Sequence, residues 1–230
     1  MCVNRRLFDS YQTPANGNLI DFEAIDGNII AELVGIQRVM AMHYILEQLE
    51  QDHQRILRMM YLLSKEIDQL TGLEKGSANC DRILEILDYI QVYPEVWHHP
   101  TEDVLFQQLL SKEHINTAAV TKLLKDHPRL ESLSAQLALI YSEFRHADLK
   151  PSTRVLLLSR HYCCKQISHI HEERNIFSAI SERFNEQDWQ TVNEALRGNQ
   201  ANHEVPTQSE YIDRSEQLNQ SHILTSIGLH

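Results

Sequence analysis

Apolar residues recur every three or four positions through four long stretches of the chain, the spacing that buries one face of an α-helix. The stretches cover about 43–70, 81–112, 117–147 and 151–184. Because the links between them are short, consecutive helices are expected to lie antiparallel. The pattern therefore predicts an all-α fold, an up-down-up-down four-helix bundle over residues 43–184.

The segments on either side of the predicted bundle have weaker patterns. Residues 1–42 are expected to form an N-terminal arm and a short helix; Asn28–Met42 is either that separate helix or an extension of the next one, interrupted near Gly35. Residues 185–230 are expected to hold a short amphipathic helix over Asp188–Arg197 and a polar C-terminal tail. The tail is expected to pack on the surface or on the other subunit of a homodimer.

Prolines and capping residues mark where the predicted helices bend or begin. Pro94 lies inside the second stretch and predicts a kink or break there. The third helix is expected to start after Asn116 or Thr117 and to bend at Pro128. Pro151 suits the first turn of the fourth helix, because a proline there gives up no helical hydrogen bond.

The composition agrees with a helical protein and narrows the classes of partner. Only seven glycines and six prolines occur in 230 residues. The formal net charge of −11 argues against nucleic acid or an anionic membrane, because those surfaces select an excess of Lys and Arg. The chain has no long apolar run, and its four cysteines follow no CxxC or disulfide spacing. We expect a cytoplasmic protein with free thiols.

Each predicted bundle helix carries one histidine in its apolar stripe. At about 100° per residue, these histidines fall among side chains that a bundle must bury. They are His53, His98, His127 and His169. Any one alone is more often a surface or hydrogen-bonded core residue than a ligand. Four at matching depth are better explained by a shared metal, because unpaired buried polar groups cost several kcal/mol apiece.

Two of these histidines are followed by a glutamate one helical turn later. His98 and Glu102 stand four residues apart, as do His169 and Glu173, so each pair shares one face of its helix. With 13 histidines and 32 acidic residues, a single copy of this spacing is weak evidence. Its repetition on two inward faces adds both glutamates to the predicted ligands.

Other polar residues nearby are expected to lie outside the ligand set. His99 and Asp103 repeat the same spacing, but they lie about 100° or more from the apolar stripe of His98. We therefore expect them on the surface or as partners that orient the ligands. Glu50 and Glu95 stand three residues before the first two ligand histidines and are expected to orient those imidazoles.

The predicted ligand set favours two metal ions over one. Six imidazole and carboxylate ligands exceed the four of a tetrahedral zinc site, and they suit iron, with manganese or zinc as alternatives. A ferritin-like site is the rival, and it needs Glu-x-x-His on two helices and a glutamate on each of the others. Here those steps fall on the first two helices, and four inward histidines are too many. Two ions bridged by carboxylates fit better.

Motifs over residues 43–184 resemble those of the hemerythrin-like family with its HHE cation-binding motifs. The resembling segments are Asp52-His53, His98–Phe106, Asp126-His127 and His169–Phe177. The resemblance implies a non-haem di-iron centre in which Glu102 and Glu173 bridge the irons, together with an oxide or hydroxide from solvent. It assigns His53 and His98 to one iron and the other two histidines to the second.

One departure from this family bears on function. Oxygen-carrying hemerythrins have a further histidine one turn after the third-helix ligand, where this chain has Glu131. The remaining set is similar to that of di-iron proteins of nitrosative stress and iron-centre repair. The resemblance implies a protein that binds or reduces O2, peroxide or nitric oxide in a stress or sensing role. A passive oxygen or iron store and an interaction module with a structural metal site remain alternatives, so turnover is left open.

The residues above and below the histidine level suggest how a ligand enters. One layer is apolar and consists of Leu46, Leu105, Val120 and Ile176; the other contains Met60, Gln91, Ser134 and Tyr162. We expect small ligands to approach from the more polar layer. Glu131 and Tyr162 are candidates for moving a proton there, or Glu131 is a seventh ligand, whereas Tyr162 is equally well an ordinary core residue bonded to the backbone.

Overall fold

The computed structural model describes residues 27–70, 77–200 and 208–226, and this part of the chain is helical, without a strand. The predicted arm before residue 27 lies outside the described residues. The chain divides into residues 1–38 and residues 39–230, and the core, the candidate site and the cavity described below lie in the second unit. The helices are α1 (Gly27–Leu70), α2 (Ser77–Tyr93), a π-helix (Pro94–His98), α3 (His99–Leu110), α4 (Thr117–Ala147), α5 (Thr153–Arg183), α6 (Glu186–Gln200) and α7 (Gln208–Ser226).

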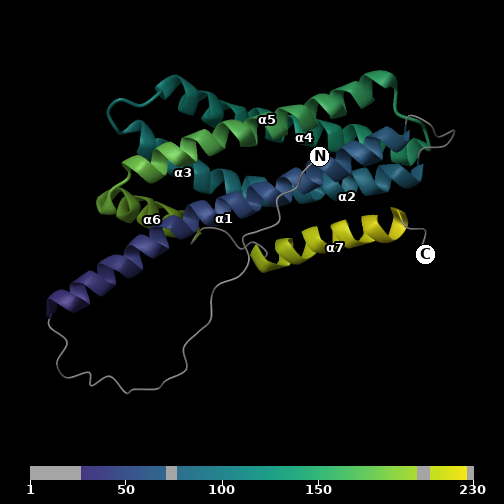
Figure 1. Cartoon of the computed structure of the whole chain (residues 1–230). Coiled ribbons are helices and arrows are strands. Elements are labelled where there is room, and N and C mark those ends of the chain that lie inside the picture. The colour runs from purple at the N-terminus through teal and green to yellow at the C-terminus, as the bar shows by residue number, and fades with distance from the viewer. Residues whose placement is uncertain (1–26, 71–76, 201–207, 227–230) are drawn as a thin grey trace, which may run out of the picture. The chain divides into compact units, whose positions relative to one another are not determined.

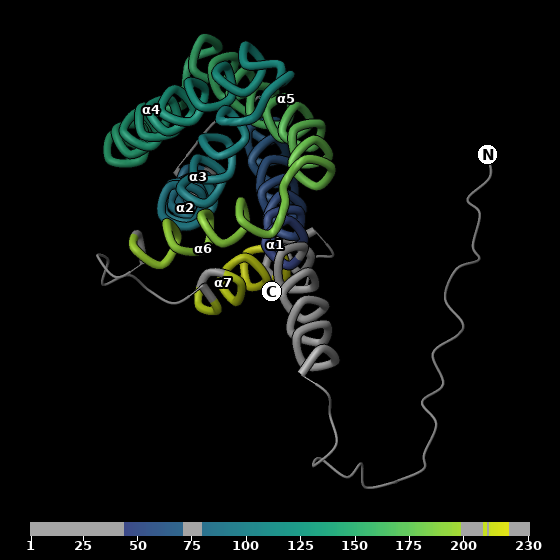
Figure 2. The backbone as a smooth tube through the Cα atoms, turned by 90° about the vertical axis from the view of Figure 1, so that its left-hand side faces the viewer, coloured from purple at the N-terminus to yellow at the C-terminus, as the bar shows by residue number. Residues whose placement is uncertain are grey.

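Four long helical segments surround one interior. Figure 1 shows α4 and α5 running alongside α2 with α3, and Figure 2 looks along them so that α1 closes the group. Backbone contacts join α2 to α4 and α4 to α5. No helix in the described part of the chain is long and apolar enough to cross a membrane.

The core consists of two apolar clusters, one on each side of the predicted ligand level. The cluster beyond the glutamates contains Leu105, Val120 and Ile176, with Leu46 packed against it, so the predicted apolar layer is confirmed. The other cluster contains Met60 and Tyr162. The predicted histidine level therefore lies between two regions that exclude water.

The predicted interruption at Pro94 is confirmed and takes the form of a π-helix. Proline has no N–H to continue the ladder of α2, and the backbone N–H of His99 donates instead to the carbonyl of Pro94, five residues back. A π-turn holds more residues than an α-turn, so α3 is rotated relative to a continuous α-helix. The π-helix ends four residues before Glu102 and therefore affects which side chains of α3 face inward.

Local signals set most of the other boundaries. The Asn116 side chain accepts a hydrogen bond from the backbone N–H of Ala119 at 3.1 Å, which confirms the predicted start of α4. Pro128 lies inside α4 without ending it. The placement of Pro151 in the first turn of α5 is wrong, because Ser152 is the N-cap and the helix begins at Thr153.

Both extensions differ from the simplest prediction. Because α1 is unbroken from Gly27 to Leu70, Asn28–Met42 extends the first helix and is not a separate one. The expected amphipathic helix is α6, but the expected polar tail contains a second helix, α7. Polar contacts hold α7 to α2, including a hydrogen bond of 2.7 Å from Arg82 to the carbonyl of Leu218. Among the described side chains of α7, Leu218 alone belongs to the buried apolar core, so the helix leaves only a weak apolar period in the sequence.

Candidate metal centre

The six predicted ligands come together from four segments of the fold. His53 lies on α1, His98 on the π-helix, Glu102 on α3, His127 on α4, and His169 and Glu173 on α5. All six side chains are buried, and none is more than 4% exposed. The sequence therefore placed these imidazoles and carboxylates correctly at one interior level.

Glu102 faces imidazoles on both sides of the interior. Its Oε1 lies 3.2 Å from Nε2 of His53 and 3.2 Å from Nε2 of His98. Its Oε2 lies 3.5 Å from Nε2 of His127, on the opposite helix. One carboxylate thus points one oxygen at each of two groups of histidines.

Glu173 has the same arrangement from the other direction. Its Oε1 lies 2.7 Å from Nε2 of His169 and 3.1 Å from Nε2 of His127, whereas its Oε2 lies 3.2 Å from Nε2 of His53. The two carboxylates therefore stand side by side between the α1 histidine and the α4 histidine. Each carboxylate therefore has its two oxygens directed at imidazoles of different helices.

The chemistry of these atoms fits metal ions. Among the described residues, Oε2 of Glu102, Oε2 of Glu173 and Nε2 of His169 are buried and have no hydrogen-bond partner. Buried polar atoms rarely remain unsatisfied, so such a group of inward donors indicates a bound cation. The donor atoms form two groups, each within 4.8 Å: one contains His53, His98 and both glutamates, and the other contains three histidines.

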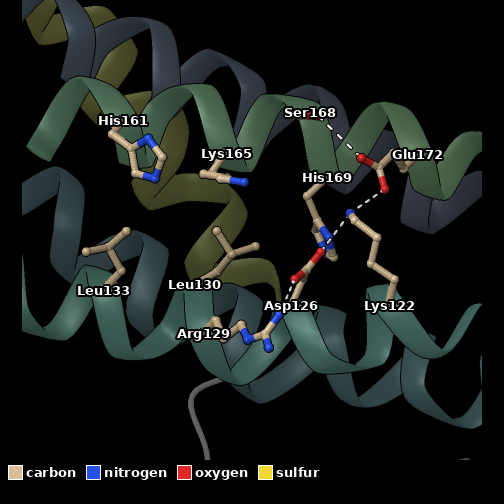
Figure 3. Close-up of a pocket in the computed structure, with 10 residues that line it drawn as sticks. All are labelled: Lys122, Asp126, Arg129, Leu130, Leu133, His161, Lys165, Ser168, His169 and Glu172. Carbon is tan, nitrogen blue, oxygen red and sulfur yellow. Dashed lines mark hydrogen bonds and ion pairs between the residues drawn. The ribbon is translucent and has the colours of Figure 1, made fainter. Parts of the chain in front are cut away.

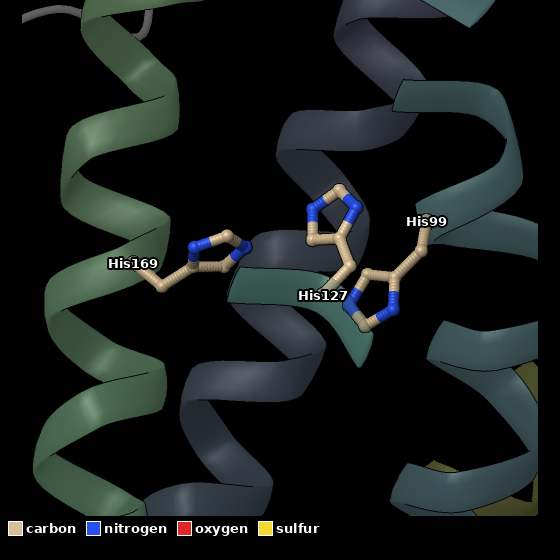
Figure 4. Close-up of side chains that lie close together, drawn as sticks. All are labelled: His99, His127 and His169. Carbon is tan, nitrogen blue, oxygen red and sulfur yellow. The ribbon is translucent and has the colours of Figure 1, made fainter. Parts of the chain in front are cut away.

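The third histidine of the second group is His99, which the sequence analysis placed outside the ligand set. Its side chain is 4% exposed, so a surface position is wrong. The ring stacks on that of His127, with 4.2 Å between centroids and 5° between planes. Figure 4 shows His99, His127 and His169 converging from α3, α4 and α5. The helical wheel missed His99 because the buried face of α3 is wider than one stripe: Phe106, seven residues after His99, is buried as fully as Leu105.

The outward nitrogens of two ligand histidines have carboxylate neighbours on other helices. Nδ1 of His127 lies 2.8 Å from Oδ1 of Asp103, which agrees with the predicted orienting role of that residue. Nδ1 of His98 lies 3.6 Å from Asp52, which accepts a hydrogen bond from Tyr93 and another from Arg55 at 2.7 Å. Asp52 is therefore fixed by two donors beside the imidazole.

The two glutamates expected to orient imidazoles have different surroundings. Oε2 of Glu50 lies 3.6 Å from Nδ1 of His53, and Arg174 holds Glu50 through hydrogen bonds of 2.6 and 3.0 Å. Glu95 lies close to Glu131 instead. Burial and the charge of Glu131 raise the pKa of Glu95 to about 7.

The candidate proton carriers also have defined positions. Oε1 of Glu131 lies 2.6 Å from Nδ1 of His99, so this carboxylate contacts a histidine of the second group. Tyr162 is 1% exposed, and burial raises its pKa far above the ordinary value. The Tyr162 hydroxyl therefore stays protonated. Neither residue belongs to the two groups of converging donor atoms.

The imidazoles of the site share protons with its carboxylates, so the positive and negative charges offset each other. Burial lowers the pKa of His98, but the charge of Glu102 outweighs it and raises the pKa to about 10. For His127, hydrogen bonds to Asp103 and Glu173 likewise outweigh burial and give a pKa of about 10. Burial raises the pKa of Glu173, but hydrogen bonds with imidazoles bring it well below its ordinary value. A cation entering the site displaces these imidazole protons.

A cavity of about 210 Å³ opens between α4 and α5 beside the site. Figure 3 shows His169 lining it together with Leu130 and Leu133 of α4. Lys122 crosses its end and binds Asp126 at 2.9 Å and a glutamate of α5 at 2.6 Å. The cavity lies next to a ligand histidine and is bounded by both charged and apolar side chains.

The described part of the chain is all-helical, and imidazoles and carboxylates converge in its interior. These two features define the class of helical metal-binding proteins. Residues 44–180 match the sequence profile of the family described as Hemerythrin HHE cation binding domain. The match spans more than half of the chain, so the protein belongs to the hemerythrin HHE family, and the predicted resemblance is confirmed. Comparison with curated proteins and with solved structures gave no match.

Proposed function

We propose that the protein holds two iron ions and uses them to bind or reduce a small oxidant. The observation that carries this proposal is the arrangement of Glu102 and Glu173, each of which faces both groups of imidazoles. A single ion would need only one oxygen from each carboxylate. Two oxygens facing two donor groups favour a pair of ions on an antiparallel four-helix bundle.

The proposed ligands of this centre fall into two sets of histidines and one pair of carboxylates. His53 and His98 would hold one ion, and His127 and His169 the other, while the two carboxylates would bridge them. Iron bound by such ligands supplies exchangeable electrons and affinity for O2, nitric oxide or peroxide. The apolar clusters on both sides exclude bulk water and so strengthen electrostatic interactions within the site.

The cavity between α4 and α5 offers an approach for a small ligand. It borders His169 from the side of Leu130 and Leu133, whereas buried apolar residues close the interior beyond the glutamates. The cavity is not lined by Met60, Gln91, Ser134 or Tyr162, so this approach runs between two helices and not through the predicted polar layer. A site that only braced the bundle would have no use for such an approach, so the cavity favours ligand binding.

The experiment uses protein loaded with Fe²⁺ under anaerobic conditions. The optical spectrum is recorded before and after O2 or nitric oxide is added, with and without a reductant. Reduction chemistry predicts a spectral change followed by continued consumption of the gas when a reductant is present. Storage predicts a reversible change without consumption. No change with either gas, in protein that contains iron, would contradict the proposed function and leave a structural metal.

A further inference from the structure

One nitrogen of His99 is directed at the other two histidines of the second group, as Figure 4 shows. Glu131 occupies its Nδ1 at 2.6 Å, and its ring stacks on His127 and lies edge-on to His169. One nitrogen of His99 lies within 4.8 Å of donor atoms of both these histidines. Its position therefore matches that of a ligand and is closer to the site than an orienting residue requires.

The contact with Glu131 selects the tautomer that a ligand needs. A carboxylate only accepts hydrogen bonds, so Nδ1 of His99 must carry the proton that faces Oε1 of Glu131. In a neutral imidazole the other nitrogen, Nε2, then keeps its lone pair. This is the pattern found at metal-bound histidines, where a carboxylate on one nitrogen fixes the ring and leaves the other for the metal.

Two neighbouring histidines reach the interior where the π-helix meets α3. Adjacent residues of a helix point about 100° apart, so two buried neighbours are directed at different parts of the interior. Here the wider turn ends with the His99 N–H bonded to Pro94, and both His98 and His99 are buried. The ring centroids of His98 and His99 are 5.9 Å apart, and His98 lies against Glu102 while His99 lies against His127.

We propose that His99 is a ligand of the ion held by His127 and His169, and that Glu131 is its positioning residue. This rests on the proposed function, because it assumes that the centre holds metal. The proposal also gives Glu131 a different role from ligation or proton transfer, for which the sequence made it a candidate. The second ion then has three imidazoles and the first has two, so the two positions are chemically unequal.

The first test compares variants by anaerobic Fe²⁺ titration followed by calorimetry. H99F keeps an aromatic ring on His127 but has no nitrogen, so the weaker step of metal binding should lose more than ~100-fold in affinity, beyond the ~10–100-fold typical of an outer partner. E131L, which removes the acceptor, should lose ~10–100-fold, and E131Q, which keeps an acceptor oxygen, should lose less. H171A changes an exposed histidine of α5 and should bind as the wild type does.

The outcomes separate this proposal from the proposed function. Wild-type protein that binds no metal would contradict both. Wild-type protein that binds two ions, together with an H99F variant of equal affinity, would overturn only the role of His99. A greater loss in E131Q than in H99F would make Glu131 the ligand and also overturn the proposal.

A second measurement needs no variant of the site and therefore does not depend on whether H99F folds. Imidazole ¹⁵N NMR of the wild type loaded with Zn²⁺ reports which ring nitrogen carries a proton and which binds metal. We expect His99 to show a protonated Nδ1 and a metal-shifted Nε2. In E131L the preference for the Nδ1-protonated form should weaken. A proton on Nε2 of His99 in the loaded wild type would refute its role as a ligand.

Discussion

At the scale of the residue, the site depends on which atom faces each imidazole. The inward nitrogens meet Glu102 and Glu173, and the outward nitrogens of several histidines meet other carboxylates. A carboxylate on the outward side fixes the orientation of the ring and makes the inward nitrogen a better donor. Residues that never touch a metal are therefore expected to affect its affinity.

Asp103 is the clearest of these outward partners, because it lies 2.8 Å from Nδ1 of His127. D103A removes this acceptor, and we expect the affinity for metal to fall ~10–100-fold. D88A is the matched control, since Asp88 is exposed to a similar degree, 54% against 49%, and lies on α2 away from the ligands. Calorimetric Fe²⁺ titration measures both. Equal losses in the two variants would show that the effect reflects net charge and not orientation.

Glu95 makes stability depend on pH. Its folded pKa of about 7 lies above the ordinary 4.5, so the folded protein loses stability as the pH rises through this interval. E95Q removes this loss; it should match the wild type below pH ~4.5 and melt ~2 °C higher at pH 8, a small gain because solvent screens a partly exposed group. Thermal unfolding of metal-free protein at both pH values measures it, with E113Q, at an exposed position, as control. A gain that is equal at both pH values would contradict this account.

At the scale of the element, a helix end or a buried face was predicted correctly wherever residues close to it in the chain determine it. The apolar period located the four long segments, and the Asn116 cap located the start of α4. The apolar period could not locate His99, because the buried face of α3 is wider than one stripe and also takes in Phe106, seven residues after His99. The helix α7 was missed for another reason, since among its described side chains Leu218 alone belongs to the buried apolar core, and polar contacts such as that of Arg82 add to its attachment. Six of the seven histidine and glutamate residues at the site were nevertheless found from their faces and spacing.

The junction of α5 and α6 depends on Asp188. This buried carboxylate accepts hydrogen bonds from the backbone N–H of Asn185 at 2.8 Å and from Gln108 of α3 at 2.7 Å, and it pairs with Lys112 at 2.5 Å. D188A removes a helix cap and the shared acceptor of two half-buried side chains, so we expect a loss of about 2 kcal/mol in the free energy of unfolding. Urea unfolding measures it, with E194A, on the exposed side of α6, as control. A loss no larger than that of the control would contradict the role of Asp188.

The α4–α5 pair forms the proposed approach to the centre. Leu133 lines the cavity beside His169, and L133W would fill much of its volume of about 210 Å³. We expect nitric oxide to bind more slowly to the reduced protein while the number of bound metal ions stays unchanged. L139W places the same side chain at a position of α4 that is 69% exposed, and it should bind at the wild-type rate. Stopped-flow absorbance measures the rates, and unchanged kinetics in L133W would exclude this route.

At the scale of the whole molecule, the centre joins α1, α4 and α5 to the π-helix and α3, between two apolar clusters. Metal that binds the folded chain and not the unfolded one stabilises it by ~2.7 kcal/mol at a hundredfold excess over Kd. For a chain of this length we expect a rise of ~5–10 °C in Tm on loading with Fe²⁺ without oxygen. Calorimetric scans with metal and with a chelator measure this rise. A Tm that does not depend on metal would mean that the ions do not bind the buried site.

The most direct test of a two-iron centre is the amount of metal per chain. Protein purified with iron supplied is analysed for metal and protein concentration, together with E102A and E173A, which each remove a carboxylate that faces both groups of imidazoles. We predict about two irons per chain in the wild type and a large loss in each variant, as expected of bridging carboxylates in a helical bundle. A wild type with fewer than about one iron per chain, or variants that keep the full amount, would contradict a pair of ions bridged by Glu102 and Glu173.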